Sequence, residues 1–161
     1  MKVYIGRYHK DHTKERKIRV EIHDYDTWSL DDTLAHIIYP ALLKFKENNN
    51  HIFADNKEEM MACEDDEKWK EYEARSEEIL DEMIWSFKQI SEGKELNLDD
   101  YRIGELKECY FTPVEGHPEL TQWNNDTEYD WERYHKDSDE FYGKIQRGLA
   151  LFAKHYMALW T

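Results

Sequence analysis

Hydrophobic residues near the amino end of the chain recur at every second position. Val3 and Ile5 alternate with Lys2 and Tyr4, and a second alternation runs through residues 18–22. A period of two is typical of a strand that buries one face, and the polar sequence HKDHTKER separates the two segments. The pattern predicts a basic β-hairpin over residues 1–24 with half-buried strands. A third strand is expected in residues 108–114, ECYFTPV, which are rich in aromatic and β-branched residues.

Farther along the chain, hydrophobic residues recur at spacings of three and four, the period of an amphipathic helix. This spacing predicts three main helices over residues 29–47, 68–91 and 139–160. Residues 91–137 hold many turn-forming residues, so we expect them to be mostly loop around the third strand. The apolar stripes consist of Leu30, Leu34, Ile37, Ile38, Ala41, Leu42 and Phe45; of Trp69, Tyr72, Ile79, Leu80, Met83, Ile84, Phe87 and Ile90; and of Tyr142, Ile145, Leu149, Phe152, Tyr156 and Leu159.

The first of these helices carries both a start signal and an interruption. Ser29 is a favourable N-cap, and Asp31 and Asp32 place negative charge in the first turn, where the helix dipole favours it. Pro40 lacks an N–H and crowds the carbonyl of His36. We therefore expect a kink within this helix or a break near residue 39.

Together these elements predict an α+β fold, in which three main helices pack on a small antiparallel sheet or β-hairpin. The chain has 161 residues, of which 40% are hydrophobic. That length and composition are typical of one domain with one core, so we expect a single domain over residues 1–161. The apolar stripe continues to Leu159 and Trp160, and this end of the chain should dock on the core or on another subunit.

The charge of the chain is unevenly distributed. The net charge is −14, yet residues 1–20 hold seven Lys or Arg against two acids, a net +5 that leaves −19 for the rest. Nonspecific binding of duplex nucleic acid by the whole surface is therefore not expected. Two interpretations of the basic segment stay open: it neutralises the acidic body by folding onto it, or it binds an anion or a nucleic acid.

The sequence also favours one compartment. Its first ten residues, MKVYIGRYHK, lack the apolar core of a signal peptide, and no apolar run reaches the roughly 18 residues that a membrane helix requires. Cys63 and Cys109 are expected to be free thiols in a reducing environment. We expect a cytoplasmic protein that has no contact with a membrane.

Histidine and acidic residues supply a candidate metal site. Asp32 and His36 share a helix face, as do Glu78 and Glu82, and His155 lies on the last helix. Two-metal sites in helical bundles use a Glu-x-x-His motif, which the predicted helices lack. His23-Asp24 matches only the metal-binding dipeptide of HD-type phosphohydrolases and falls at the end of a predicted strand rather than on a helix. We expect no cofactor, and keep this metal set as an alternative.

Tryptophan is abundant, with six residues in the chain. Trp28 is expected to help to cover the first helix, whereas Trp85 lies off the apolar stripe of the long helix, beside Asp81 and Glu82. Such a tryptophan either closes a small core or anchors an interface. The acidic runs EEMMACEDDE and EYEARSEEILDE are typical of solvated helix faces, and they also permit mimicry of a nucleic acid.

Three blocks, in order along the chain, carry a resemblance. They are DTWSLDDTLAHIIYPALLKFKE (residues 26–47), DEMIWSFKQI (residues 81–90) and GLALFAKHYMALW (residues 148–160). Together they resemble a family of small uncharacterised proteins encoded by tailed bacteriophages. The resemblance implies a phage origin and no particular activity. This chain departs from the family pattern at Ala150, where relatives carry arginine, and at the asparagine run in residues 48–50.

From these features we expect a phage accessory protein that binds a host component, in host takeover or defence evasion, without enzymatic activity of its own. The alternatives are a metal-dependent phosphohydrolase or nucleotide-binding protein, an acidic nucleic-acid mimic and a minor virion protein. Self-association is expected through the apolar carboxyl end. The candidate binding residues are Asp26, Trp28, Asp32, His36, Asp81, Glu82, Trp85, His155 and Trp160.

Overall fold

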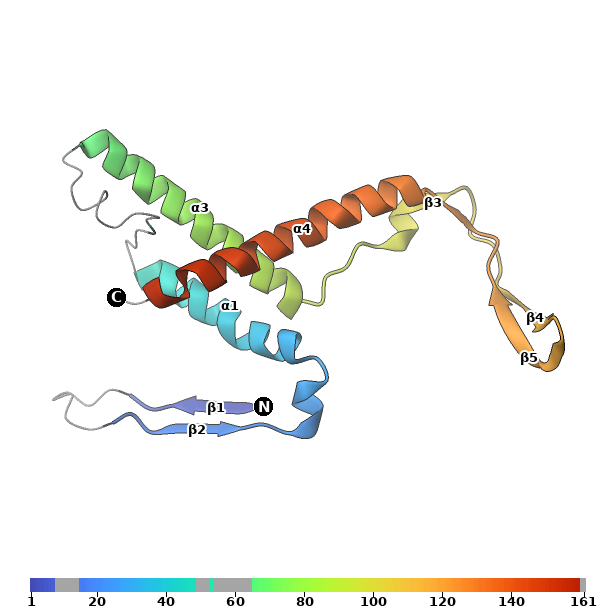
Figure 1. The fold of residues 1–161 in the computed structure, drawn as a ribbon, viewed down its shortest axis with the longest axis horizontal. Helices are drawn as coiled ribbons and strands as arrows, with labels where there is room; N and C mark the ends of the chain where they lie inside the picture. Colours follow the sequence, from blue (N-terminus) through green and yellow to red (C-terminus); the bar gives the residue numbers. More distant parts are fainter. Residues whose placement is uncertain (8–14, 49–52, 54–64, 160–161) are drawn as a thin grey trace. The chain divides into compact units, whose positions relative to one another are not determined.

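A computed structural model describes residues 1–7, 15–48, 53 and 65–159. Its internal contacts gather into two compact units: unit 1 comprises residues 1–94 and 144–161, and unit 2 comprises residues 95–143. The described residues form three α-helices and three two-stranded antiparallel sheets (Figure 1), which confirms the predicted α+β class. A compact unit is not by itself a domain, so the single domain stays a prediction.

Unit 1 begins with the predicted β-hairpin. Strand β1 (Lys2–Ile5) pairs antiparallel with β2 (Ile18–Glu21), with Val3 opposite Val20 and Ile5 opposite Ile18. The prediction of half-buried strands is wrong, because these four aliphatic side chains are 41–65% exposed. The alternation of period two places them on one face of the ribbon, but no second layer of the described structure covers that face.

The first two helices match their predicted ranges closely. A 3₁₀ turn, η1 (Asp24–Thr27), leads into α1 (Leu30–Asn48), and α3 (Asp66–Ser91) follows. The Asp65 side chain accepts the Glu67 N–H and caps α3. In the described part of the chain, no helix combines the length and the apolar character needed to cross a membrane.

Helix α4 (Trp131–His155) starts eight residues before the predicted residue 139. The reason is a capping aspartate that the sequence interpretation overlooked: the Asp130 side chain accepts the Arg133 N–H at 3.0 Å, and its carbonyl accepts the Tyr134 N–H. After His155 the chain forms a 3₁₀ turn, η3 (Tyr156–Ala158). The last predicted helical residue, Trp160, lies outside the described residues.

Of the two outcomes expected at Pro40, the break near residue 39 is wrong, because α1 runs without interruption from Leu30 to Asn48. The kink stays a prediction. Ala35 and Leu42, one on each side of the proline, are buried in the core. Their packing on the other helices holds both halves of α1 in place, which offsets the hydrogen bond that proline cannot make.

The core of unit 1 forms where the three predicted apolar stripes meet. Helix α1 contributes Leu42 from its predicted stripe and Ala35, which the stripe did not include, whereas the predicted members Leu30, Leu34 and Ile37 are exposed. Leu149 and Phe152 of α4 pack against the buried cluster. Leu159 also packs against it, so the described end of the carboxyl-terminal stripe docks on the core, which is one of the two expected outcomes. The remaining buried members are Phe53, Leu80, Met83, Ile84 and Phe87.

Helices α3 and α4 approach closely at one pair of small residues (Figure 1). A Cβ atom added to Gly148 would lie 2.0 Å from the Ser86 Oγ and 2.6 Å from the Glu82 carbonyl oxygen. Ser86 is fully buried, and its hydroxyl donates to that same carbonyl at 2.9 Å. The glycine therefore sets the distance between the two helices.

Unit 2 is built on an antiparallel ribbon. Strand β3 (Arg102–Ile103) pairs with β6 (Glu128–Tyr129), and β4 (Tyr110–Val114) pairs with β5 (His117–Asn124). Strand β4 confirms the predicted third strand, whereas β5 lies in a region expected to be mostly loop. Its sequence HPELTQWN contains a proline and several polar residues that do not predict a strand, and only its pairing with β4 makes it one.

An aromatic cluster supports the base of this ribbon. Tyr101, which ends the 3₁₀ turn η2 (Leu98–Tyr101), is 7% exposed and contacts the Tyr134 ring edge-on. Its hydroxyl donates to Asp137 at 3.0 Å, and the Arg133 guanidinium lies over its ring. Burial and the Asp137 carboxylate raise the pKa of Tyr101.

Replacing Gly148 with alanine is expected to lower the free energy of unfolding by about 1–3 kcal/mol, the usual cost of overpacking. Helix propensity alone would instead raise the free energy of unfolding, because alanine is more favourable than glycine in a helix by about 1 kcal/mol. Urea denaturation followed by far-ultraviolet circular dichroism measures the change. The matched control is Ala150→Gly, an exposed site on the same helix, which tests propensity only. A Gly148→Ala variant as stable as the wild type would contradict the close approach.

Candidate functional site

Asp26 is a buried structural residue at the junction of the hairpin and α1. Its side chain, 7% exposed, accepts from the Met1 α-amino group at 2.5 Å and from the His23 N–H at 2.8 Å. The first of these bonds is the main reason that the pKa of Asp26 is lowered, and the second adds to it. The Asp26 carbonyl also accepts the Thr33 hydroxyl at 3.1 Å. Asp26 thus ties the start of β1, the end of β2 and the first turn of α1 together.

This junction displays aromatic side chains rather than covering them. Trp28 is 90% exposed and Tyr25 is 72% exposed. The prediction that Trp28 helps to cover the first helix is therefore wrong. The 3₁₀ turn that Asp26 fixes directs both rings away from the core, and the apolar residues Ile22 and Leu30 beside them are also exposed. We call residues 22–30 the β2–α1 junction.

The next predicted pair lies on the surface of α1. His36 Nε2 is 3.6 Å from the Asp32 carboxylate, and the two side chains are 61% and 45% exposed. The i, i+4 spacing brought them together as predicted. An exposed pair of this kind contributes little to stability.

The acidic residues of α3 lie in a shallow depression with two cations of α4. Glu78, Asp81, Glu82 and Trp85 line it together with Lys144 and Arg147. The Lys144 ammonium lies 4.1 Å from the centre of the Trp85 ring, and Arg147 Nε donates to Glu82 at 3.1 Å. Trp85 is half-buried under this lysine, so its position off the apolar stripe is explained by a cation–π contact within the chain.

Asp81 also takes part in the contact between α1 and α3. The Lys46 ammonium donates to the Asp81 carboxylate at 2.5 Å and lies 3.4 Å from Glu77. Asp81 is the main reason that the pKa of Lys46 is raised. Glu77, Asp81 and Glu82 of α3 are therefore paired with cations on the two neighbouring helices. Ion pairs of this kind are a common structural role of charged helix faces.

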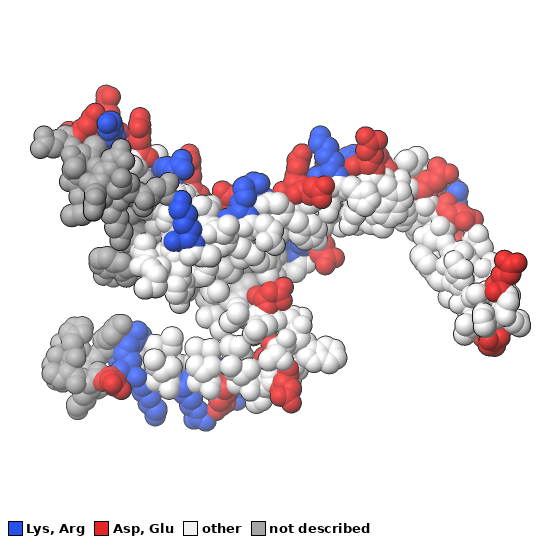
Figure 2. Space-filling model, viewed as in Figure 1, with Lys and Arg blue, Asp and Glu red and all other residues white. Residues whose placement is uncertain are grey.

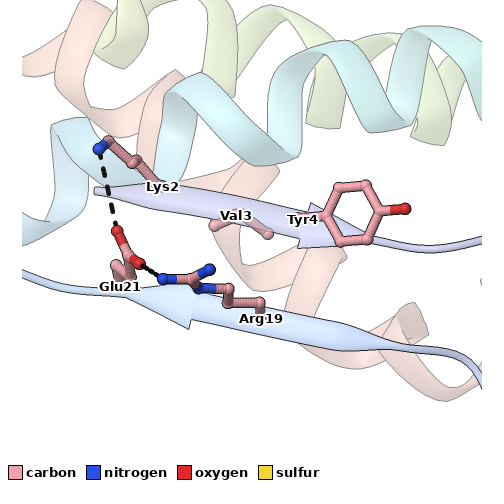
Figure 3. Close-up of a pocket in the computed structure, with 5 residues that line it drawn as sticks. All are labelled: Lys2, Val3, Tyr4, Arg19 and Glu21. Atoms are coloured by element: carbon pink, nitrogen blue, oxygen red, sulfur yellow. Dashed lines mark hydrogen bonds and ion pairs between the residues drawn. The ribbon is translucent and has the colours of Figure 1, made fainter.

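A second depression lies on the basic hairpin and is formed by side chains of both strands. Figure 3 shows Glu21 between Lys2 and Arg19: it pairs with Arg19 and lies 3.9 Å from the Lys2 ammonium. Tyr4, 58% exposed, completes the same face. The ion pairs that involve these two cations thus stay within the hairpin.

The two carboxyl-terminal candidates have different outcomes. His155 is 6% exposed, and its ring lies 4.9 Å from the Phe53 ring inside the core. Trp160 lies outside the described residues. His155 is therefore a core residue in this structure.

The proposed metal set is not brought together. Across the described ranges, no three His, Cys, Asp or Glu side chains form a group that could hold a metal ion. Asp32 and His36 lie on the surface of α1, Glu78 and Glu82 lie beside α4, and His155 is in the core. Shared helix faces alone predicted this set, but the packing of the helices places its members in three different environments.

The sequence analysis missed one exposed feature, the pairing of Phe111 with Trp123. These residues lie opposite each other in the β4–β5 register and are 68% and 56% exposed. In the sequence, the alternation of Phe111 and Pro113 with polar residues indicates a strand with one apolar face. This alternation does not indicate which segment pairs with that strand.

Comparison with protein-family models, with curated proteins and with solved structures gave no match for this chain.

Acid should remove the contribution of Asp26 to stability. Because the pKa of Asp26 is lowered on folding, its stabilisation is present above the ordinary carboxyl pKa of about 4 and is lost as the pH falls through the folded-state value. We expect Asp26→Asn to be less stable than the wild type near neutral pH, and the difference to shrink below about pH 4. Urea unfolding at a series of pH values measures it.

The matched control for this experiment is Asp31→Asn, since Asp31 is an exposed acid in the first turn of α1. It should change stability little at any pH. A difference between Asp26→Asn and the wild type that stays constant down to pH 3 would show that the carboxylate charge does not stabilise the junction.

Proposed function

We propose that this chain is a phage accessory protein that binds a host protein in the bacterial cytoplasm and has no catalytic activity of its own. The phage origin rests on the resemblance of the three sequence blocks. The binding role rests on one observation, the 90% exposure of Trp28 on a structured turn.

The exposure of Trp28 is costly to the free protein. Burial of apolar surface contributes about 25 cal/mol per Å², and an aromatic side chain buries about 150–250 Å². A tryptophan kept in water therefore forgoes several kcal/mol that a binding partner can recover. Tryptophan is also among the residues most enriched at the energetic centres of protein interfaces.

The turn that carries Trp28 is held in a defined conformation, which favours binding. The Asp26 carboxylate accepts hydrogen bonds from the Met1 α-amino group and the His23 N–H, and the Asp26 carbonyl accepts one from the Thr33 hydroxyl. A side chain displayed on a fixed backbone loses less entropy on binding than one on a loose loop.

The surroundings of Trp28 define the chemistry of the partner. Tyr25, Ile22 and Leu30 extend the apolar surface, and all three are exposed. Asp24 and Asp31 add negative charge beside it. The expected partner surface is an apolar pocket for the indole with basic residues at its rim.

Affinity purification from the bacterial host tests this proposal. The full chain is expected to capture one host protein in stoichiometric amount, and Trp28→Ser should weaken binding of that purified protein about tenfold or more in calorimetry. Met157→Ser is the matched control, because Met157 is 85% exposed at another place on unit 1 and its replacement should leave the affinity unchanged.

The contrary outcomes are equally specific. Equal binding by the wild type and Trp28→Ser would exclude the β2–α1 junction as the interface. Turnover of a nucleotide or phosphoester by the purified chain would contradict the non-enzymatic role and favour the phosphohydrolase alternative.

A further inference from the structure

The β4–β5 hairpin of unit 2 has two chemically different faces. Because side chains alternate along a strand, Phe111, Pro113, Thr121 and Trp123 share one face in the observed register. The other face carries Tyr110, Thr112, Gln122 and Asn124, and its polar groups bond within unit 2. Asn124 Nδ2 donates to the Thr112 hydroxyl at 2.8 Å, and the Tyr110 hydroxyl donates to Asp126 at 3.1 Å.

The apolar face stays exposed among the residues that the structure describes. Phe111 and Trp123 lie directly opposite each other across the two strands and are 68% and 56% exposed. A two-stranded ribbon is marginally stable by itself, so a face with two large aromatic side chains gains most when another surface covers it. We call this pair the aromatic platform, and its tryptophan is among the residues most enriched at the energetic centres of protein interfaces.

The charge around this platform has one sign. Residues 108–132 contain seven acids and neither lysine nor arginine. Glu115 lies in the turn between the two strands and Glu119 lies in β5. Figure 2 shows the turn of the hairpin labelled in Figure 1 with red acidic atoms on a white surface. This negative field opposes nucleic acid and anionic lipid, and it attracts cationic protein surfaces.

The strands themselves are poorly suited to accept another strand. Pro113 lies in β4 and Pro118 lies in β5. Proline has no N–H to donate to an added strand, and residues of this type protect exposed sheet edges from pairing. Binding is therefore expected through the side chains of the face rather than through extension of the sheet.

We propose that the apolar face of the β4–β5 hairpin docks an arginine-rich protein surface. The guanidinium group stacks on aromatic rings and pairs with carboxylates, so arginine suits both the platform and the acids around it. A partner of this chemistry includes the basic surface of a nucleic-acid-binding protein. The inference concerns unit 2 and does not depend on the proposed role of Trp28 in unit 1.

Binding of short synthetic peptides to the full chain tests the inference. The probes are a peptide of alternating arginine and serine, the same peptide with lysine, and a single-stranded oligonucleotide, compared by calorimetry at physiological ionic strength. The arginine peptide is expected to bind more tightly than the lysine peptide, and the oligonucleotide should not bind. Tighter binding of the oligonucleotide, or equal binding of both peptides, would overturn the proposal.

Two variants locate the site. Phe111→Ser with Trp123→Ser leaves the net charge unchanged and should weaken arginine-peptide binding about tenfold or more. Glu115→Gln with Glu119→Gln keeps both aromatic residues, and should weaken binding and lower its salt dependence. Since the first variant risks unfolding the hairpin, the second keeps the test decisive.

The control is Met157→Ser, which removes an exposed apolar side chain from unit 1 and should leave peptide binding unchanged. If Met157→Ser weakens peptide binding as much as the paired hairpin variant does, or if neither hairpin variant weakens it, the peptide does not bind specifically at the β4–β5 hairpin and the proposal fails. Loss of host-protein binding by Trp28→Ser would then still stand as a separate result.

Discussion

The close approach of α3 and α4 at Gly148 is the constraint on which the packing of unit 1 depends. A side chain at this position would overlap the backbone of α3 at Glu82 and the buried Ser86. Only because the two helices meet at this distance can Leu149 and Phe152 reach the cluster around Met83. The same crossing brings Lys144 over Trp85 and Arg147 to Glu82. One residue without a side chain thus determines both the core and the surface beside it.

A second constraint acts at the β2–α1 junction, where a carboxylate with little exposure is satisfied by a charged amine and a backbone N–H. A charge in such a place is tolerated only when its hydrogen bonds are made. Asp26 makes them with Met1 and His23, which lie far apart in sequence but meet at this turn. These bonds hold the turn on which Trp28 is exposed.

The two β-hairpins show how similar architecture acquires different surfaces. Each is a two-stranded ribbon with one uncovered apolar face, aliphatic in β1–β2 and aromatic in β4–β5. The first lies in the basic segment of the chain, while residues 108–132 around the second carry only negative charge. The two apolar faces therefore lie in segments of opposite net charge.

The sequence by itself determined the α+β class, the β1–β2 hairpin and the ranges of α1 and α3, because short-range periodicity and capping residues encode local structure. The early start of α4 follows from a local signal, the Asp130 cap, which the sequence-based prediction did not use. The sequence did not determine the strand β5, the continuity of α1 through Pro40 or the exposure of Trp28. These three depend on contacts between distant segments: pairing with β4, packing on both sides of the proline, and the bond between Met1 and Asp26. The candidate metal-site residues lie in different environments for the same reason. Spacing along a helix determines which residues share a face, but it does not determine which other element packs against that face.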